Sequence, residues 1–306
     1  MTWAPGRLPP QRGRVFVVTG GNAGLGYFTA EQLASTGAHV VLASRSVERA
    51  DAAIRSIRAR VPRASLARIT VDLSSLESAT AAGAAIAEYD RLDGLVLNAG
   101  MTTGPRERRE SADGLELTLA TNYAGHFALT AAAWPILART PESRVVGLGS
   151  LSTELVRLEP HDLASERRYG FFRAYAFSKH AMHGFVLELD RRARAAGTGV
   201  SAVLAHPGYA IDGLSPERPG IVARTPGDRA YGVAIAVAAQ GKNRGAAPTV
   251  RAMLDPVVVG GEFVGPEFLT RGRPVLQVPV ASSASPEFGD YLWQQSELWA
   301  GARFDV

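Results

Sequence analysis

Up to about residue 204, short apolar runs alternate with longer segments in which apolar residues recur every three or four positions. Non-alternating, β-branched runs are typical of strands covered on both faces, and the periodic segments are typical of amphipathic helices. The predicted strands are Val15–Thr19, Val40–Ala43, Leu66–Val71, Leu95–Asn98, Val145–Leu148 and Val200–Leu204. The predicted helices are Leu25–Thr36, Val47–Arg60, Leu76–Tyr89, Leu115–Leu137 and Ala174–Ala195. This order predicts an α/β fold with a doubly wound parallel sheet, a Rossmann fold.

No Pro/Gly/Ser-rich linker interrupts these segments, so residues 1–306 are predicted to form a single domain. The pattern becomes loop-like from Pro207 to Thr225, a helix is predicted near Asp228–Gln240, and a short final strand near Glu262–Val264. The parts outside the predicted core are an N-terminal extension (1–13), two substrate-side loops (about 151–174 and 208–228) and a C-terminal extension (about 241–306).

Composition limits the class of protein. With 46% hydrophobic and 20% charged residues the chain is not of the disordered type, and without cysteine it has neither disulfides nor thiolate metal sites. No apolar stretch approaches about 18 residues, and the N-terminus lacks the apolar core of a signal peptide, so a cytoplasmic protein without a membrane span is expected. The sequence pI is about 9.6, but the arginines are scattered, so nucleic-acid binding is not expected.

Lysine is rare in this chain. Among the 33 Lys and Arg residues only Lys179 and Lys242 are lysine. Arginine therefore supplies the ordinary surface cation here, and a lysine retained against this bias is a candidate for a specific role.

A glycine-rich loop joins the first predicted strand directly to the first predicted helix. Glycines allow a sharp turn and close approach of backbone to a pyrophosphate, and a helix N-terminus offers free N–H groups to phosphates. An ordinary glycine-rich turn is the alternative, but the strand before it and the helix after it favour dinucleotide binding. The residues expected to line this site are Thr19, Gly20, Asn22, Gly24, Leu25 and Gly26.

The end of the second strand favours NADP(H) over NAD(H). An NAD site usually places Asp or Glu there to bind the adenosine ribose, whereas this strand ends in Ser44 and Arg45. The guanidinium of Arg45 could pair with a 2′-phosphate, although a merely solvated arginine is the alternative.

Two later strand ends are expected in the same crevice, because the carboxyl ends of parallel strands share one edge of the sheet. Asp72 and Leu73 follow the third strand, where an acid could reach the adenine amino group. Asn98, Ala99 and Gly100 follow the fourth, where small residues let the backbone approach the ribose. Asp and Asn are also common in turns, so position gives these residues their weight.

Tyr175 and Lys179 are the candidate acid/base pair. Residues four apart share one face of a helix, so the phenol and the ammonium should point the same way. A nearby cation would favour phenolate and lower a tyrosine pKa from about 10. Tyr169 lacks such a partner because Arg173 stands four residues on, and a surface i,i+4 pair is the alternative reading of Tyr175 and Lys179.

In order along the chain, these motifs resemble the short-chain dehydrogenase/reductase family, and more narrowly its retinol-dehydrogenase-like, protochlorophyllide-reductase-like branch. The motifs are the glycine loop, Asn98-Ala-Gly100, Asn122 in Thr-Asn-Tyr-Ala-Gly-His-Phe, Ser150, Tyr175-x-x-x-Lys179, His206-Pro207-Gly208 and the closing Trp293 and Trp299 segment. The resemblance implies that Tyr175 is the general acid/base, that Lys179 lowers its pKa, that Ser150 binds the substrate oxygen and that Asn122 holds a water. It also implies cofactor contacts from Pro207 and Gly208, and a homodimer paired through the helices at 115–137 and 174–195.

The chain departs from the family pattern at three points, of which one, Leu97 where Asn is frequent before Asn98, is expected to have no consequence. Gly147 and Gly149 stand where Asn and a first Ser are frequent, so Ser150 is the expected serine and Ser152 remains an alternative. Asp212 stands near a position commonly held by a threonine that touches the nicotinamide carboxamide, which puts that contact in question.

The expected function is that of an NADPH-dependent oxidoreductase acting on a carbonyl or alcohol. Apolar residues after Ser150 and after Pro207 could form a cover over a lipophilic, natural-product-like substrate, or could pack on the domain itself. They are Leu155, Leu158, Tyr169, Phe171, Phe172, Tyr209, Ile211 and Leu214. A weakly catalytic NADPH-binding accessory or sensor protein, and an epimerase or lyase without net redox turnover, are the alternatives.

Overall fold

The structure is a computed structural model that describes residues 8–222 and 225–306. Residues 1–7 of the predicted N-terminal extension and residues 223–224 of the predicted loop 208–228 lie outside the described residues. Within the described ranges, none of the helices combines the length and the apolar character needed to cross a membrane.

A central eight-stranded sheet organises the chain, in the order β10-β9-β6-β5-β4-β1-β2-β3. Its strands are β1 (Val15–Thr19), β2 (His39–Ser44), β3 (Ser65–Thr70), β4 (Gly94–Leu97), β5 (Arg144–Leu148), β6 (Ser201–Ala205), β9 (Phe263–Pro266) and β10 (Pro274–Gln277). All neighbours run parallel except β9 and β10, which pair antiparallel. A separate parallel pair joins β7 (Ala210–Ile211) to β8 (Gln240–Gly241). The predicted doubly wound parallel sheet is therefore confirmed.

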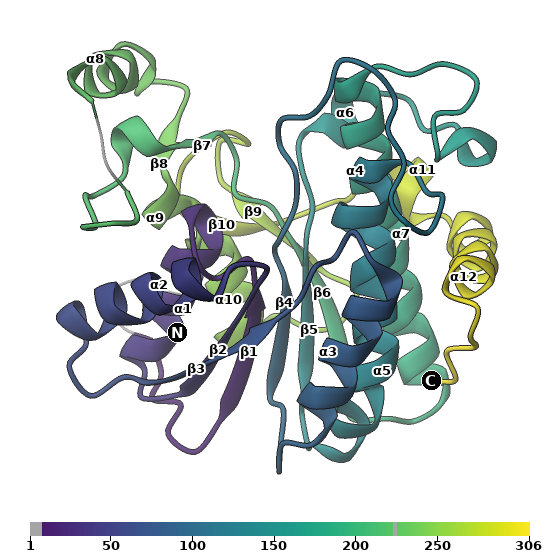
Figure 1. Cartoon of the computed structure of the whole chain (residues 1–306), viewed down its shortest axis with the longest axis horizontal. Coiled ribbons are helices and arrows are strands. Elements are labelled where there is room, and N and C mark those ends of the chain that lie inside the picture. Colours follow the sequence, from purple (N-terminus) through teal and green to yellow (C-terminus); the bar gives the residue numbers. More distant parts are fainter. Residues whose placement is uncertain (1–7, 223–224) are drawn as a thin grey trace.

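Helices cover both faces of the sheet, as Figure 1 shows. One face carries α1 (Gly24–Ser35), α2 (Val47–Arg60) and α10 (Ala247–Leu254). The other face carries α3 (Leu76–Ala87), α5 (Gly125–Arg139) and α7 (Phe171–Ala195), with α12 (Pro286–Ala300) outside α7. The shorter helices are α4 (Leu117–Leu119), α6 (Ser152–Leu155), α8 (Pro226–Ile235), α9 (Lys242–Gly245), α11 (Ala281–Ala284), the π-helix η1 (Ala120–Ala124) and the 3-10 turns η2 (Pro160–Asp162) and η3 (Asp212–Leu214).

The strands bury side chains on both faces, which accounts for their non-alternating sequences. In β1, Phe16 and Val18 belong to the apolar cluster beneath α1 and α2, whereas Val17 belongs to the cluster beneath α3, α5 and α7. All three side chains are at most 1% exposed. Two separate apolar layers thus hold the sheet, and its strand ends remain free to build a site.

The helix predicted over Leu115–Leu137 is confirmed as one helical run, over residues 117–139, but a π-helical turn interrupts its α-helical hydrogen bonding. It divides into α4, η1 and α5, and the Glu116 carboxylate caps its start by accepting hydrogen bonds from Thr118 N and Leu119 N at 2.9 and 2.7 Å. Apolar periodicity does not separate a π-turn from an α-turn, so the sequence missed the interruption.

Other boundaries differ by a few residues, and several elements after residue 239 were not predicted. The helix predicted at Ala174 begins at Phe171, and the one predicted near Asp228–Gln240 is the shorter α8. The predicted final strand is β9, which is followed by the unpredicted β10. The unpredicted helices α10 and α12 lie in the segment predicted only as a C-terminal extension.

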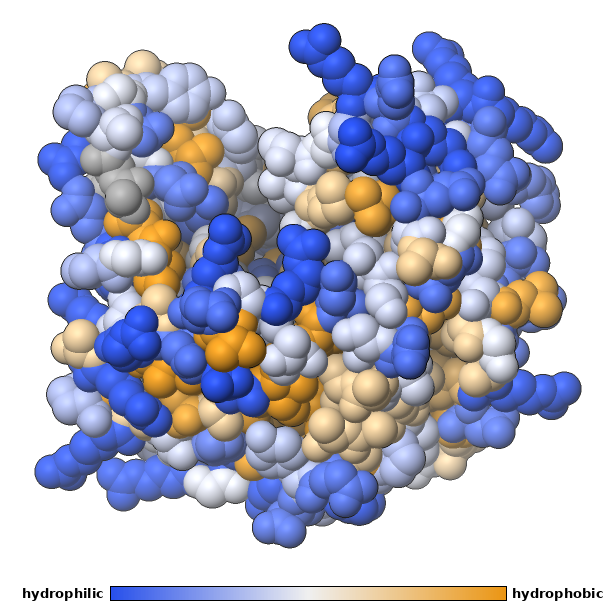
Figure 2. Space-filling view, viewed as in Figure 1, coloured by the Kyte–Doolittle hydropathy of each residue, from blue (hydrophilic) through white to orange (hydrophobic). Residues whose placement is uncertain are grey.

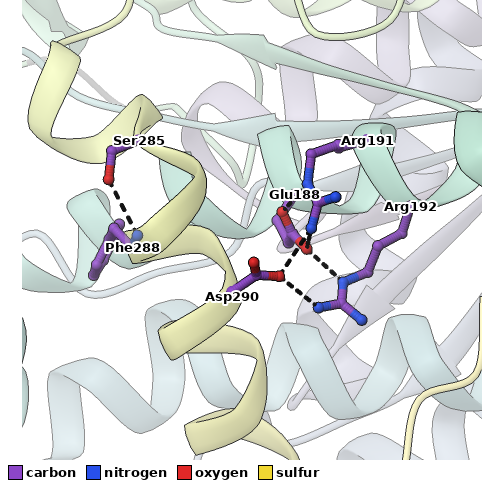
Figure 3. Close-up of polar contacts among 6 residues, drawn as sticks. All are labelled: Glu188, Arg191, Arg192, Ser285, Phe288 and Asp290. Carbon is purple, nitrogen blue, oxygen red and sulfur yellow. Dashed lines mark hydrogen bonds and ion pairs between the residues drawn. The ribbon is translucent and has the colours of Figure 1, made fainter.

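Helix α12 packs along α7 and closes an aromatic cluster. Trp293 is 2% exposed and lies with its ring centroid 4.8 Å from that of Phe304 and 5.4 Å from that of Phe127. Figure 3 shows the polar part of this contact, in which Arg191 and Arg192 of α7 bind Glu188 of the same helix and Asp290 of α12. The outer face of α7 is thus covered by the same chain.

Candidate active site

The glycine loop after β1 adopts the conformation that its sequence predicts. Gly20 and Gly24 have φ values of +67° and +56°, which side-chain-bearing residues rarely adopt. A Cβ at Gly26 would overlap the carbonyl oxygen of Gly20 and the amide of Asn98, so only glycine fits there. Among the residues that the structure describes, no side chain caps the start of α1, whereas Ser46 and Ser75 cap α2 and α3, and the first turn of α1 has no acidic residue. Its N–H groups are therefore available to an anion.

Thr19 joins the glycine loop to the end of β4. Its hydroxyl oxygen accepts hydrogen bonds from the backbone N–H groups of Asn98 and Ala99 at 2.9 and 3.0 Å. The Asn98 side-chain amide returns a hydrogen bond to the carbonyl of Thr19 at 2.8 Å. Three predicted cofactor residues thus fix the spacing between two neighbouring strand ends.

His126 completes this network and was not predicted as a site residue. Its Nδ1 lies 3.0 Å from the Asn122 carbonyl, which can only accept, so Nδ1 carries the hydrogen and Nε2 accepts from the Thr19 hydroxyl at 2.9 Å. Burial lowers the pKa of His126 to about 4, which keeps the ring neutral and this pattern intact. The Asn-Tyr-Ala-Gly-His motif contained the residue, but its partner stands 107 positions away.

The predicted adenosine side lies at the ends of β2 and β3. Ser44 is buried, and Arg45, which precedes the capping residue Ser46 of α2, is exposed. Asp72 is partly committed to its own turn, because its Oδ1 accepts from Ser74 N at 3.0 Å and from Ser74 Oγ at 2.7 Å. Leu73 is buried, with its carbonyl packed on Gly125 of α5. Arg45 differs from Asp72, because its guanidinium is exposed and, over the described part of the chain, takes no part in a local turn.

Asn122 lies in the π-helix η1 and ties three segments together. Its Oδ1 accepts from Met101 N at 2.7 Å, and its Nδ2 donates to Ser178 Oγ in α7 at 3.0 Å. A Cβ at Gly100 would lie 3.0 Å from Asn122 Oδ1, so a small residue is needed there. Asn122 therefore holds the loop after β4 against the helix that carries Tyr175, and its side chain serves this structural contact.

Tyr175 and Lys179 share one face of α7, with the Lys179 ammonium 5.9 Å from the centroid of the Tyr175 ring. Phe171 stacks on the same ring with centroids 6.3 Å apart. Lys179 is 6% exposed and donates a hydrogen bond to the carbonyl of Leu148 at 2.8 Å. Burial lowers the pKa of Lys179 to about 8.

Burial raises the pKa of the Tyr175 phenol, and the hydrogen bond with Ser150 lowers it by a smaller amount. The direction is opposite to the one expected from Lys179, and the geometry supplies the reason. The Lys179 ammonium is directed at the Leu148 carbonyl, while the phenol is mostly removed from water and its anion is poorly solvated.

Ser150 is the serine that reaches the phenol. It follows β5, hydrogen-bonds Tyr175 and accepts from Ser152 N at 3.1 Å. The Ser152 hydroxyl is buried and has no hydrogen-bond partner within the described residues. Gly149 is explained by packing, because a Cβ there would overlap Nε2 of His183 in α7. The family's serine is replaced by Gly149 here because the buried ring of His183 fills the space that a side chain would need.

Pro207 and Gly208 turn the chain away from β6 toward the cleft. Gly208 has a φ of +66°, and a Cβ on it would overlap the carbonyl of Thr270. The Pro207 carbonyl accepts from the Gln240 side chain at 2.8 Å. Farther on, Asp212 forms an ion pair with Lys242 at 2.6 Å, so the position commonly held by threonine carries a neutralised carboxylate.

Figure 2 shows a deep hollow at the carboxyl edge of the sheet, between the α8 side and the α6 side of the molecule. Of the apolar residues expected to cover a substrate, Leu155, Phe172 and Tyr209 are 74%, 53% and 44% exposed. Leu158 is buried, so that residue packs on the domain itself. A cavity of about 340 Å³ adjoins Ser150 and is lined by further apolar side chains, among them Leu269, Leu276 and Val278.

Comparison with known proteins identifies the family. The family model described as short chain dehydrogenase matches residues 14–212. Human retinol dehydrogenase 12 is 38% identical over 197 residues, which cover 64% of this chain and 61% of the relative. Mouse polyprenol dehydrogenase is 38% identical over 226 residues, covering 72% of this chain and 67% of the relative. The matched region thus spans about three fifths of the human enzyme.

Solved structures agree with these matches. A protein of Mycobacterium paratuberculosis superposes with a TM-score of 0.81 at 30% identity, covering 100% of both chains. A short chain dehydrogenase from Burkholderia cenocepacia in complex with NADP has a TM-score of 0.62 at 25% identity, covering 83% of this chain and 96% of that one. The chain therefore belongs to the short-chain dehydrogenase/reductase family, in its retinol-dehydrogenase-like branch.

Proposed function

We propose that the protein is an NADPH-dependent oxidoreductase that moves hydride between the cofactor and a carbonyl or secondary alcohol. The observation that carries the proposal is the convergence of Ser150, Tyr175 and Lys179 beside the glycine loop, at the carboxyl edge of the sheet. A protein that only binds the dinucleotide has no need for a half-buried phenol hydrogen-bonded to a serine.

The residues present fit a dinucleotide. Gly20, Gly24 and Gly26 leave backbone and N–H groups open where side chains would otherwise stand, and the uncapped start of α1 favours a pyrophosphate. Thr19, Asn22, Leu25, Asn98, Ala99 and Gly100 would line the same cradle, and Ser44, Arg45, Asp72 and Leu73 its adenosine end. Pro207 and Gly208 would lie toward the nicotinamide. When bound, the nicotinamide supplies or takes the hydride.

The catalytic roles follow from position. Tyr175 would give a proton to the substrate oxygen during reduction, or take one during oxidation, while Ser150 hydrogen-bonds that oxygen. Lys179, held by the Leu148 carbonyl, would place its ammonium beneath the phenol and near the ribose hydroxyls. Asn122 would act through the backbone and Ser178 contacts that hold this part of α7 in place.

Arg45→Ala is expected to raise the Kd for NADPH by roughly ten- to a hundredfold, the loss of one charged phosphate contact, and to change the Kd for NADH little. The reason is that the guanidinium is exposed beside the expected position of the 2′-phosphate, and no carboxylate ends β2. Isothermal titration with both cofactors measures this. Arg55→Ala removes the same charge from an exposed position farther along α2 and is the control. Equal losses for the two cofactors would refute the phosphate-reading role.

A lipophilic, natural-product-like substrate is proposed on two grounds. The relatives are named retinol and polyprenol dehydrogenase, and the cleft is bordered by exposed apolar residues such as Leu155, Phe172 and Tyr209. A panel of carbonyl compounds graded in apolar size, followed by NADPH oxidation, tests the proposal. Stoichiometric NADPH consumption separates a reductase from an epimerase or lyase, and absence of turnover with every compound favours the accessory or sensor role.

We also propose that residues 1–306 form one domain, because β1–β6, β9 and β10 belong to one sheet. We further propose the homodimer that the family resemblance implies, paired through the helices at 115–137 and 174–195. Such pairing would have to accommodate α12, which packs along α7, and Phe304, whose ring centroid lies 5.5 Å from that of the buried Trp134 in α5.

A further inference from the structure

The second lysine of the chain lies over the glycine loop. The Lys242 ammonium is 3.7 Å, and its Cδ 3.8 Å, from the point where a Cβ on Gly24 would stand. Gly24 is the first residue of α1, where the helix has no side-chain cap. Lys242 lies 218 positions away along the chain from Gly24, so only the tertiary fold brings this cation to the loop.

Lys242 is held in that position by α9 and its neighbours. The side chain of Gln32 in α1 donates to the carbonyl of Asn243 at 2.9 Å. Gly245 packs closely on Leu25, because a Cβ there would lie 3.0 Å from the Leu25 side chain. The backbone N–H of Lys242 itself donates to Ser215 Oγ at 2.8 Å. The base of the lysine is therefore fixed relative to the N-terminus of α1.

Asp212 faces the same ammonium because of the β7–β8 pair. Ile211 pairs with Gly241 in the register of these strands, so the residues that follow them, Asp212 and Lys242, come out side by side. Their side chains form the 2.6 Å ion pair and are 48% and 24% exposed. An unneutralised carboxylate at this point would repel a pyrophosphate on the glycine loop.

We propose that Lys242 binds the cofactor pyrophosphate above Gly24, and that its ammonium at the same time neutralises the carboxylate of Asp212. The inference rests on the proposed function, since it concerns the same dinucleotide site. It accounts for the retention of lysine here, because a compact ammonium with rotatable donors can contact a carboxylate and a phosphate at once. It also accounts for an acid near the nicotinamide side of the cleft.

The test is Lys242→Gln, measured by isothermal titration with NADPH and with NADH. Because both carry the pyrophosphate, the Kd of each is expected to rise by a similar factor of roughly ten, a modest value for a partly exposed ion pair, and less at high salt. Arg45→Ala, by contrast, should affect NADPH alone. Arg244→Gln is the matched control: it removes one positive charge from the same short helix, at a residue that lines a separate cavity with Gln32 and Ser35.

Adenosine 2′-monophosphate, which has no pyrophosphate, is the second probe. Its binding, measured by competition with NADPH, should be unchanged in Lys242→Gln. A Kd for NADPH and NADH equal to that of the wild-type protein or of Arg244→Gln would overturn the inference while leaving the proposed function intact. Failure of the wild-type protein to bind either dinucleotide would instead overturn the proposed function.

Asp212→Asn tests the coupling between the two residues. With Lys242 present, this variant should bind NADPH at least as tightly as the wild-type protein, because a negative charge near the phosphates is removed. In the Asp212→Asn background, Lys242→Gln should cost less affinity than it does alone, since no unpaired carboxylate is left behind. Equal losses in both backgrounds would contradict the neutralising role of Lys242.

Discussion

Tyr175→Phe is expected to lower kcat by roughly a thousandfold or more while the Kd for NADPH changes by less than about threefold, consistent with loss of a general acid/base. The phenylalanine keeps the ring that stacks on Phe171 and removes only the hydroxyl that hydrogen-bonds Ser150. Steady-state kinetics with the best carbonyl compound and titration with NADPH measure the two quantities.

The control for this variant is Tyr89→Phe, which removes a hydroxyl just after α3, beside His39 at the start of β2 and thus at the edge of the sheet opposite to the cleft. It should leave kcat unchanged. Turnover by Tyr175→Phe at the wild-type rate would rule out the proposed acid/base. If the Kd for NADPH rose along with the loss of kcat, the phenol would also support the cofactor site, and the variant would not separate cofactor binding from proton transfer.

Acid is expected to destabilise the fold strongly, because buried histidines must stay neutral in it, and His126 and His183 show the largest shifts. Burial lowers the pKa of His126 to about 4 and of His183 to about 3, from an ordinary value near 6.5. Below pH 6.5 the unfolded chain takes up these protons and the folded chain does not, so stability present at neutral pH is lost as pH falls toward 4. Two such groups cost about 5 kcal/mol by pH 4.5, comparable with the whole stability of many domains.

Denaturant unfolding at pH 7.5, 5.5 and 4.5, followed by circular dichroism, measures this loss. His183→Leu should make the fall less steep, because one titrating ring is gone and neither nitrogen of His183 has a hydrogen-bond partner within the described residues. The free energy of unfolding of the wild-type protein should decrease continuously over this range. A value that stays constant from pH 7.5 to 4.5 would show that the rings are protonated without cost.

The strands and the glycine loop could be predicted because their signals are local. A strand such as Val15–Thr19 is apolar throughout, and the positive φ of Gly20 and Gly24 is a property of glycine in a tight turn. Ordering these elements by the parallel-sheet rule then placed Arg45 at the correct edge. The spacing of Tyr175 and Lys179 placed both on one face of α7 for the same local reason.

The contacts that were missed depend on residues far apart in the sequence. His126 is a site residue because it hydrogen-bonds Thr19, and Gly149 must be glycine because it packs on His183. The raised pKa of Tyr175 in the protein alone was not predicted, because helical spacing says which face a lysine shares, and not that its ammonium turns to the Leu148 carbonyl. The helix α12 was missed because the segment with Trp293 and Trp299 was only matched to the C-terminal tail of the family, and no secondary structure was predicted for it.

The covering of α7 by α12 makes the burial of its aromatic cluster independent of protein concentration. A face completed by a second copy is lost on dilution, whereas Trp293, Phe304 and Phe127 meet within one chain. Tryptophan fluorescence is therefore expected to keep the same emission maximum from micromolar to low nanomolar protein. A red shift on dilution would show that the cluster needs a neighbouring molecule to stay dry. The helix that carries Tyr175 and Lys179 would then keep its shape even in a very dilute assay.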